Sequence, residues 1–186
     1  LVRSRGLGDV YKRQETVVSA KEKCPDLTLV PPNYDLYNKS SKALIKLLSE
    51  YTDKIEQYSI DEAFLDMTGC CDDSEQTAHE IKDRVHAQLG FTVNIGVSEN
   101  KLLAKMASDF MKPDRVHTLW KSEIQTKMWP LPVSELFYVG HASLNKLRKL
   151  GIHTIGELAA TDPGILQAHM KSQGLLICLL YTSPSP

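Results

Sequence analysis

Residues 58–68, YSIDEAFLDMT, place three acids inside a stretch that otherwise has the pattern of two short apolar strands: Asp61, Glu62 and Asp66. Adjacent carboxylates repel each other, which raises the pKa of one of them unless a cation lies between them. Hard divalent ions such as Mg²⁺ bind carboxylate oxygens and keep water or phosphate in their other positions. Asp61 and Glu62 are therefore candidate metal ligands. The alternative is a solvated loop tip, with Asp66 pointing outward from a strand.

A second group of charges follows in residues 96–115, GVSENKLLAKMASDFMKPDR. Gly96 ends a predicted strand and would allow a close approach of backbones, and Lys101, Lys105 and Lys112 follow along a predicted helix and the loop after it. Cations that face a carboxylate-bound metal suit phosphoryl or nucleotidyl transfer, which depends on positioning and on neutralising phosphate charge. The alternative is an amphipathic helix whose lysines only face solvent.

A third segment, YVGHASLNKLRKLGIHTIGEL at residues 138–158, has a glycine turn before a basic amphipathic helix and then a second helix. This pattern is typical of helix-hairpin-helix modules, in which amides at a helix N-terminus bind DNA phosphates without reading bases. Val139 and Gly140 would supply that turn. The basic residues that would add nonspecific attraction are Lys146, Arg148 and Lys149. An ordinary helical hairpin with a solvated basic face is the alternative.

The elements that must position these groups follow from periodicity and turn residues. We expect strands at 26–30, 55–60, 63–68 and 91–97, and helices at about 33–51, 77–89 and 99–110. The order strand, helix, strand, strand, helix, strand is that of the ferredoxin-like unit, so the predicted fold class is α+β. A domain boundary is expected between Trp120 and Pro132, followed by helices.

Composition restricts the class of protein but not its activity. The net charge of -1 gives no sign of a nucleic-acid partner, so any such partner must be bound by a local patch. The sequence contains no run of eighteen apolar residues, the length that could span a bilayer. We therefore expect a soluble protein with no membrane partner. The 4 cysteines include no CxxC pair, which favours reduced thiols and a cytoplasmic location.

Both ends of the chain have the character of foreign sequence. LVRSRGLGDVYKRQ at 1–14 and the tail at 175–186, which ends in CLLYTSPSP, resemble translated sequencing-adapter read-through. We therefore expect both segments to be non-native and the remainder to be an internal piece of a longer protein. A genuine basic N-terminal arm that binds nucleic acid is the alternative for residues 1–14.

Taken together and in this order, the motifs resemble the Y-family (DinB/UmuC-type, or ImpB/MucB/SamB) translesion DNA polymerases. YSIDEAFLDMTG is similar to that family's palm signature, NIGVSENKLLAKMASDFMKP to its second palm block, and LPVSELFYVGHASLNKLRKLGIHTIGEL to the start of its thumb. CPDLTLVPPNYDLY resembles its passage from fingers to palm. The resemblance implies the end of the fingers at 15–30, a ferredoxin-like palm without its first strand at 31–118, and a helix-hairpin-helix-like thumb at 119–174.

The same resemblance implies roles for particular residues. Asp61 and Glu62 match the acidic pair that binds two catalytic Mg²⁺ ions, and Lys112 matches a lysine near the incoming triphosphate. Asp66 and Lys105 match no catalytic position, and we expect them to support the strand and the helix. The implied reaction is attack of a primer 3′-hydroxyl on the α-phosphate of a dNTP, without proofreading, in lesion bypass during the SOS response to DNA damage.

The implied partners are primer–template DNA, a dNTP and a sliding clamp, which would bind through a C-terminal part beyond this chain. Three features depart from the family pattern, one of which is that the little-finger domain, which grips much of the DNA, would lie beyond the end of this chain. The remaining metal-binding Asp and a Tyr/Arg pair should precede residue 15 and are absent, and Tyr138 stands where a glycine is usual. We therefore expect this piece to be inactive alone. Competing hypotheses are a noncatalytic DNA-binding accessory protein and a ferredoxin-like nucleotidyl cyclase.

Overall fold

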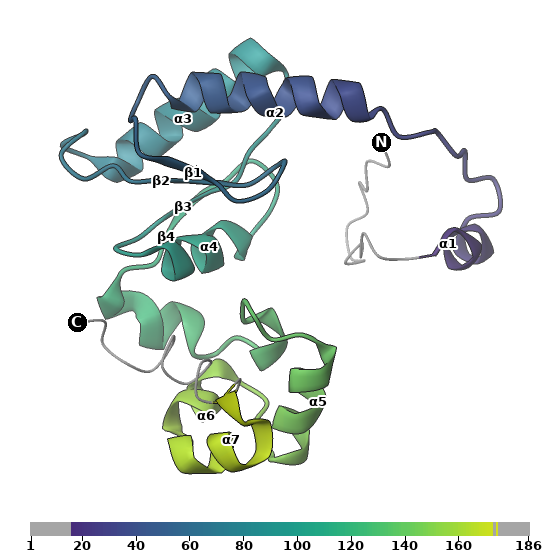
Figure 1. Cartoon of the computed structure of the whole chain (residues 1–186), viewed down its shortest axis with the longest axis vertical. Helices are drawn as coiled ribbons and strands as arrows, with labels where there is room; N and C mark the ends of the chain where they lie inside the picture. Colours follow the sequence, from purple (N-terminus) through teal and green to yellow (C-terminus); the bar gives the residue numbers. More distant parts are fainter. Residues whose placement is uncertain (1–15, 173, 175–186) are drawn as a thin grey trace.

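The computed structural model of the chain describes residues 16–172 and 174. An upper lobe contains the strands and the helices α2 and α3, and a lower lobe contains α5, α6 and α7 (Figure 1). Helix α1 (Val17–Lys23) lies apart from both lobes, at the end of an extended segment. Among the described residues, no helix combines the length and the apolar character needed to cross a membrane.

The helices of the upper lobe begin and end where their capping residues predict. Helix α2 (Tyr34–Leu48) begins after Asn33, whose side chain accepts a hydrogen bond from the Leu36 amide at 3.0 Å. Helix α3 (Ser74–Leu89) begins after Asp73, which accepts from two amides of the first turn. Gly90 ends α3 with φ 74°, in the left-handed region that favours glycine. Both predicted helices are confirmed.

The strands form two pairs within the described part of the chain. β1 (Ile55–Gln57) and β2 (Ala63–Leu65) form the predicted antiparallel hairpin, with Ile55 opposite Leu65. β3 (Ile95–Val97) pairs in parallel with β4 (Val116–Thr118), and α4 (Lys101–Asp109) is the crossover between them. The structure therefore has a mixed α+β fold, as the sequence predicts.

One hydrophobic cluster joins both strand pairs to α2 and α3. Its buried members are Leu47, Leu48, Ile81 and Val85. Ile55, Ala63 and Leu65 of the hairpin pack against it, and so does Ile95 of β3. Because both helices cover one side of both strand pairs, the hairpin and the β3–α4–β4 unit are held side by side.

Gly96 brings β3 and α4 into direct contact, as its position in the sequence predicts. A Cβ atom at residue 96 would lie 1.8 Å from the carbonyl oxygen of Ala104 and 2.6 Å from the amide nitrogen of Ser108. Real Cβ atoms do not approach backbone atoms so closely. A residue without a side chain is therefore required for α4 to lie where it does.

The lower lobe consists of short helices around a second hydrophobic cluster. In chain order these are η1 (Lys121–Glu123), η2 (Ile124–Met128), η3 (Val133–Glu135), α5 (His141–Lys149), α6 (Ile155–Ala160) and α7 (Pro163–Met170). Leu103 and Met106 of α4 belong to the same buried cluster as Leu147 of α5 and Ile155 of α6. Helix α4 thus packs on β3 with one face and on the lower lobe with another.

Three details of the predicted secondary structure are wrong. Residues 26–30 form no strand: Leu29 and Val30 are exposed, and the two prolines that follow cannot donate to a sheet. The strand expected at 91–97 is confined to β3, and β4 was not predicted because its pairing with β3 depends on the crossover through α4. The segments expected to be non-native, 1–14 and 175–186, lie outside the described residues.

Candidate active site

The two adjacent acids lie at the bend between β1 and β2, as predicted. Residues 58–62 connect the strands, and the amides of Tyr58 and Ser59 donate to the carbonyl oxygen of Glu62 at 2.9 and 3.1 Å. The Ser59 hydroxyl donates to Asp61 Oδ1 at 2.8 Å. Asp61 is exposed and Glu62 is partly buried. The bend therefore presents two carboxylates on a backbone that hydrogen bonds within the bend hold in place.

The Asp66 side chain contacts residues at the end of β2 and not residues of the bend. Its carboxylate accepts a hydrogen bond from the Thr68 amide at 3.0 Å and lies 3.7 Å from Lys54 Nζ. These contacts, with the bond to Thr68 the stronger influence, hold the pKa of Asp66 below its ordinary value. Its bonding is local to the strand end, as expected for strand support.

Lys105 of α4 contacts the bend directly and so does more than support its helix, the role expected for it. Its Nζ lies 2.6 Å from Glu62 Oε1 and 3.2 Å from Asp109 Oδ2, and its side chain is only 14% exposed. Burial alone would lower the pKa of this ammonium, but the hydrogen bond to Glu62 and the nearby charge of Asp109 raise it above the ordinary value. Lys105 is therefore a charged residue held between two acids.

Asp109 extends these contacts to Lys112. Lys112 Nζ lies 2.6 Å from Asp109 Oδ1, while the other oxygen of Asp109 faces Lys105. Burial favours the neutral form of Asp109, yet the hydrogen bond from Lys112 and the charge of Lys105 keep its pKa below the ordinary value. An unbroken series of ion pairs thus joins Glu62, at the hairpin bend, to Lys112, beyond the end of α4.

Aromatic rings from both lobes cover one side of these charges. Phe137, which follows η3, has its ring centroid 5.9 Å from Lys105 Nζ and 6.2 Å from the ring of Tyr58. Tyr58 also packs edge-on against Phe64 of β2, at 5.9 Å. The acidic bend therefore lies at the border where the upper lobe meets the start of the lower lobe.

The turn before α5 keeps the backbone shape that a glycine would give it. Tyr138 adopts φ 72°, in the left-handed region, and its ring lies 4.3 Å from that of Phe137. Gly140 is the N-cap of α5 and has no side chain to bond the first amides of the helix. Those amides carry partial positive charge and are suited to an anion such as a DNA phosphate. Val139 lies between these two residues, partly buried.

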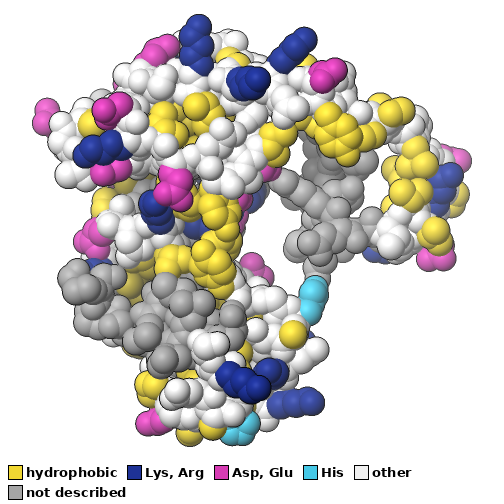
Figure 2. All heavy atoms as spheres, in the orientation of Figure 1, with side chains coloured by type: hydrophobic (Ala, Val, Ile, Leu, Met, Phe, Trp, Pro, Cys, Tyr) yellow, Lys and Arg dark blue, Asp and Glu magenta, His cyan; other side chains and the backbone are white. Residues whose placement is uncertain are grey.

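The basic residues of α5 lie at the other end of the helix from this turn. Lys146, Arg148 and Lys149 are exposed in or near the last turn, roughly 9–14 Å along the axis from Gly140 at 1.5 Å per residue. Figure 2 shows Lys and Arg side chains gathered on this part of the lower lobe. The structure therefore does not bring the predicted DNA-backbone residues into one place.

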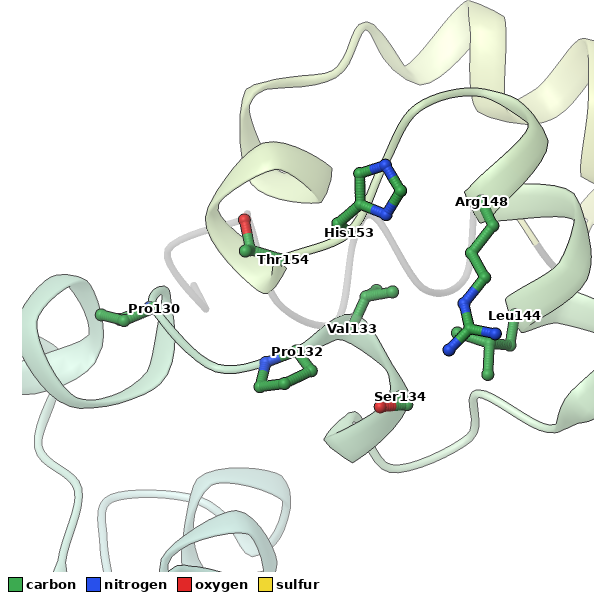
Figure 3. A pocket seen from close by; sticks show the side chains of 8 residues that line it. All are labelled: Pro130, Pro132, Val133, Ser134, Leu144, Arg148, His153 and Thr154. Atoms are coloured by element: carbon green, nitrogen blue, oxygen red, sulfur yellow. The ribbon is translucent and has the colours of Figure 1, made fainter.

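A pocket lies beside these bases, on the lower lobe. Its volume is about 320 Å³, and Arg148 and Leu144 of α5 face His153 and Thr154 across it (Figure 3). Pro132, Val133 and Ser134 form the adjoining wall. None of its lining residues belongs to the hairpin bend or to α4, so it does not form part of the acidic site.

The two hairpin acids are suited to act as ligands of a hard divalent cation, but two ligands do not complete a metal site. Among the described residues, no group of three or more His, Cys, Asp or Glu side chains could hold a metal ion. Carboxylate oxygens are nevertheless the donors that Mg²⁺ prefers. Lys105, which pairs with Glu62, and Lys112, which pairs with Asp109, add positive charge to the same series of contacts. The chemistry of Asp61 and Glu62 therefore fits two ligands of a metal site that the described residues alone do not complete.

Comparison with known families shows the family of the chain. The profile of the impB/mucB/samB family matches residues 9–109, which include the hairpin bend and α4. The chain belongs to this family. A second profile, the HHH motif of the IMS family, matches residues 121–152, from η1 to the turn that follows α5. The resemblance to Y-family polymerases is thereby confirmed, and so is the helix-hairpin-helix character of the lower lobe.

Curated relatives in the family are bacterial polymerases. The chain is 50% identical over 165 residues to DNA polymerase IV of Clostridium acetobutylicum. The aligned segment covers 88% of the chain and 42% of the relative. It is 46% identical over 174 residues to DNA polymerase IV 1 of Bacillus subtilis, covering 92% of the chain and 41% of the relative. The chain thus spans about two fifths of the length of these relatives.

Solved structures in the family share the fold. A DinB family error-prone DNA polymerase from Sulfolobus solfataricus superposes with a TM-score of 0.81 at 27% identity, covering 95% of this chain and 55% of that one. An insertion ternary complex of Dbh DNA polymerase gives the same TM-score and identity, covering 95% of this chain and 53% of that one. The two lobes therefore correspond to about half of a family polymerase.

Proposed function

We propose that the whole protein to which this chain belongs is a translesion DNA polymerase that extends a primer by template-directed nucleotidyl transfer. The observation that carries the proposal is the ion-pair series from Glu62 through Lys105 and Asp109 to Lys112. It brings a carboxylate suited to a metal and a lysine suited to a triphosphate into one charge-balanced surface. Nucleotidyl transfer requires this combination because its transition state gathers negative charge on phosphate oxygens.

In this proposal each group of the chain has a distinct task. Asp61 and Glu62 hold Mg²⁺ ions, which when bound neutralise the reacting phosphate and activate the primer 3′-hydroxyl. Lys112 attracts the triphosphate of the dNTP. The amides after Val139 and Gly140 bind the DNA backbone, and Lys146, Arg148 and Lys149 add sequence-independent attraction. A further metal ligand would come from outside the described residues.

The proposed partners are primer–template DNA and a dNTP, and a sliding clamp that would bind a part of the protein outside this chain. Two of the solved relatives are ternary complexes, which supports the first two. Because the substrate is DNA, a cytoplasmic location remains part of the proposal. The retained acids favour an enzyme over a noncatalytic accessory protein, and the matched HHH motif favours it over a nucleotidyl cyclase.

Primer extension tests the proposal. We expect the full-length protein to extend a primer in the presence of Mg²⁺, and the double variant Asp61→Ala, Glu62→Ala to lose at least about 10³-fold in rate, since removal of preorganised charge stabilisation typically costs 10²–10³ per group. The variant Asp66→Ala is a matched control, because Asp66 bonds only the strand end. Extension by the double variant at the wild-type rate would contradict the metal-site assignment.

A further inference from the structure

The structure points to Lys105 as a positioning residue for Glu62, an inference that depends on the proposed function. Lys105 Nζ lies 2.6 Å from Glu62 Oε1, although 43 residues separate the two in the sequence. Because α4 is fixed against β3 at Gly96, the lysine reaches the bend from a rigid helix and not from a loop. We infer that Lys105 sets the orientation in which Glu62 meets a divalent cation.

The surroundings of Lys105 make this contact stronger than a surface ion pair. Its side chain is 14% exposed, and the ring of Phe137 covers it at 5.9 Å. Charges that are shielded from water interact more strongly and are screened less by salt than exposed pairs. An exposed pair would exchange its partners with solvent, whereas this ammonium is kept between Glu62 and Asp109.

The contact leaves the metal-binding capacity of Glu62 available. Lys105 occupies Oε1, and within the described part of the chain no residue donates a hydrogen bond to Oε2. A carboxylate held through one oxygen presents its other oxygen in a defined direction, which is how outer residues commonly orient metal ligands. Ser59 acts similarly on Asp61, because its hydroxyl donates to Oδ1 at 2.8 Å.

Asp109 removes the obvious objection, which is that a lysine beside a metal ligand would repel the metal. Its Oδ2 lies 3.2 Å from Lys105 Nζ and so offsets the positive charge. Its Oδ1 is paired with Lys112 at 2.6 Å. The same series of contacts therefore positions the acid for the metal and the lysine for the triphosphate.

The chain offers a matched control one helical turn earlier. Lys101 also forms an ion pair with an acid of the hairpin, Glu56, and also lies 5.9 Å from an aromatic ring, that of Phe64. Its side chain is 61% exposed, however, and Glu56 belongs to strand β1 and not to the bend. Lys101 thus has the same chemistry as Lys105 without the contact to a candidate metal ligand.

The test uses the full-length polymerase with Lys105→Met, Lys105→Arg and Lys101→Met. Mn²⁺ affinity is measured by electron paramagnetic resonance in the complex with primer–template and a nonhydrolysable dNTP, and kcat and KM for the dNTP are measured by single-nucleotide extension. We expect Lys105→Met to weaken Mn²⁺ binding and lower kcat by about 10–100-fold, the range for loss of an outer-sphere partner, with KM nearly unchanged. Lys105→Arg should retain most of both, and Lys101→Met should match wild type.

Wild-type Mn²⁺ affinity and kcat in Lys105→Met would overturn the inference, even if its melting temperature fell. If Lys105→Met does not fold, Lys105→Gln, which keeps a polar donor but no charge, takes its place with the same expected losses. Failure of the proposed function has a different signature, because wild-type protein would then extend no primer. The Mn²⁺ comparison still judges the role of Lys105 in that case.

Discussion

Single side chains at the acidic site differ in how firmly their neighbours hold them. Asp61 is exposed and accepts a hydrogen bond from the Ser59 hydroxyl, and Glu62 is held by Lys105, whose side chain is 14% exposed. The position of the two acids at the hairpin bend could be predicted from the sequence, and an Asp-Glu pair is unusual there. The contact with Lys105 could not be predicted, since helical spacing alone makes every lysine on the outer face of α4 look solvated.

Asp109 gives the site a dependence of stability on pH. Since the folded-state pKa of Asp109 is below the ordinary value of 3.8, the unfolded chain binds a proton more readily. Its contribution to stability is therefore present above about pH 4 and is lost as pH falls through the folded-state value. We expect Asp109→Asn to have a lower urea midpoint than wild type at pH 7, and the difference to shrink between about pH 5 and pH 3.

Urea unfolding of both proteins across that pH range is the measurement. Glu99→Gln is the control, because Glu99 is an exposed acid beside α4, and its midpoint should follow that of wild type at every pH. A difference between Asp109→Asn and wild type that stays constant from pH 7 to pH 3 would show that the charge of Asp109 contributes nothing to the fold.

At the scale of elements, capping residues and close packing explain what the sequence could predict. Asn33 and Gly90 identify the start of α2 and the end of α3, and Gly96 identifies the contact of β3 with α4. The strand expected at 26–30 was wrong because local β propensity does not supply a partner strand. Strand β4 was missed because its pairing with β3 depends on a crossover through α4, which no local pattern reveals.

Gly96→Ala should displace α4. The added Cβ would meet the Ala104 carbonyl at 1.8 Å, so the helix must move, and overpacking of this kind costs about 1–3 kcal/mol or more in the free energy of unfolding. Because α4 carries Lys105, primer extension should fall as well. Denaturant unfolding measures the first effect, with Gly140→Ala as control: nothing lies within 4 Å of a Cβ there, so less than about 1 kcal/mol is expected. Equal losses for both variants would contradict the packing argument.

At the scale of the whole molecule, α4 packs against both lobes, for which separate domains were predicted from the sequence. The boundary between Trp120 and Pro132 stays a prediction, and Leu103 and Met106 of α4 are buried in the cluster of the helical lobe that follows it. The residues that bury α4 there come from segments far along the chain, so local periodicity could not reveal this packing. The hairpin bend and the turn before α5 are consequently attached to one helix and its neighbours.

DNA binding should respond to the bases of α5 in a way that depends on salt. Each phosphate contact contributes a slope of about 0.9 in log Kd against log salt concentration, so neutralising three bases should reduce the slope by nearly three. The substitutions, all to Gln, are at Lys146, Arg148 and Lys149. Fluorescence anisotropy with full-length protein and a primer–template duplex provides the measurement.

The control for this experiment neutralises the same number of lysines on the outer face of α2, in the other lobe. These lysines are Lys39, Lys42 and Lys46. Their loss should leave the salt slope of DNA binding close to that of wild type. Equal reductions in slope for the two triple variants would mean that the bases of α5 act only through net charge and not through contact with the duplex.

The most direct measurement is a crystal structure of the full-length protein with primer–template, a nonhydrolysable dNTP and Mn²⁺, using the anomalous signal to place the metal. We expect Mn²⁺ within about 2.0–2.3 Å of carboxylate oxygens of both Asp61 and Glu62, with Lys105 still bonded to Glu62 and the triphosphate beside Lys112. Mn²⁺ bound away from the hairpin bend, with both carboxylates turned to solvent, would contradict the assignment of the catalytic site.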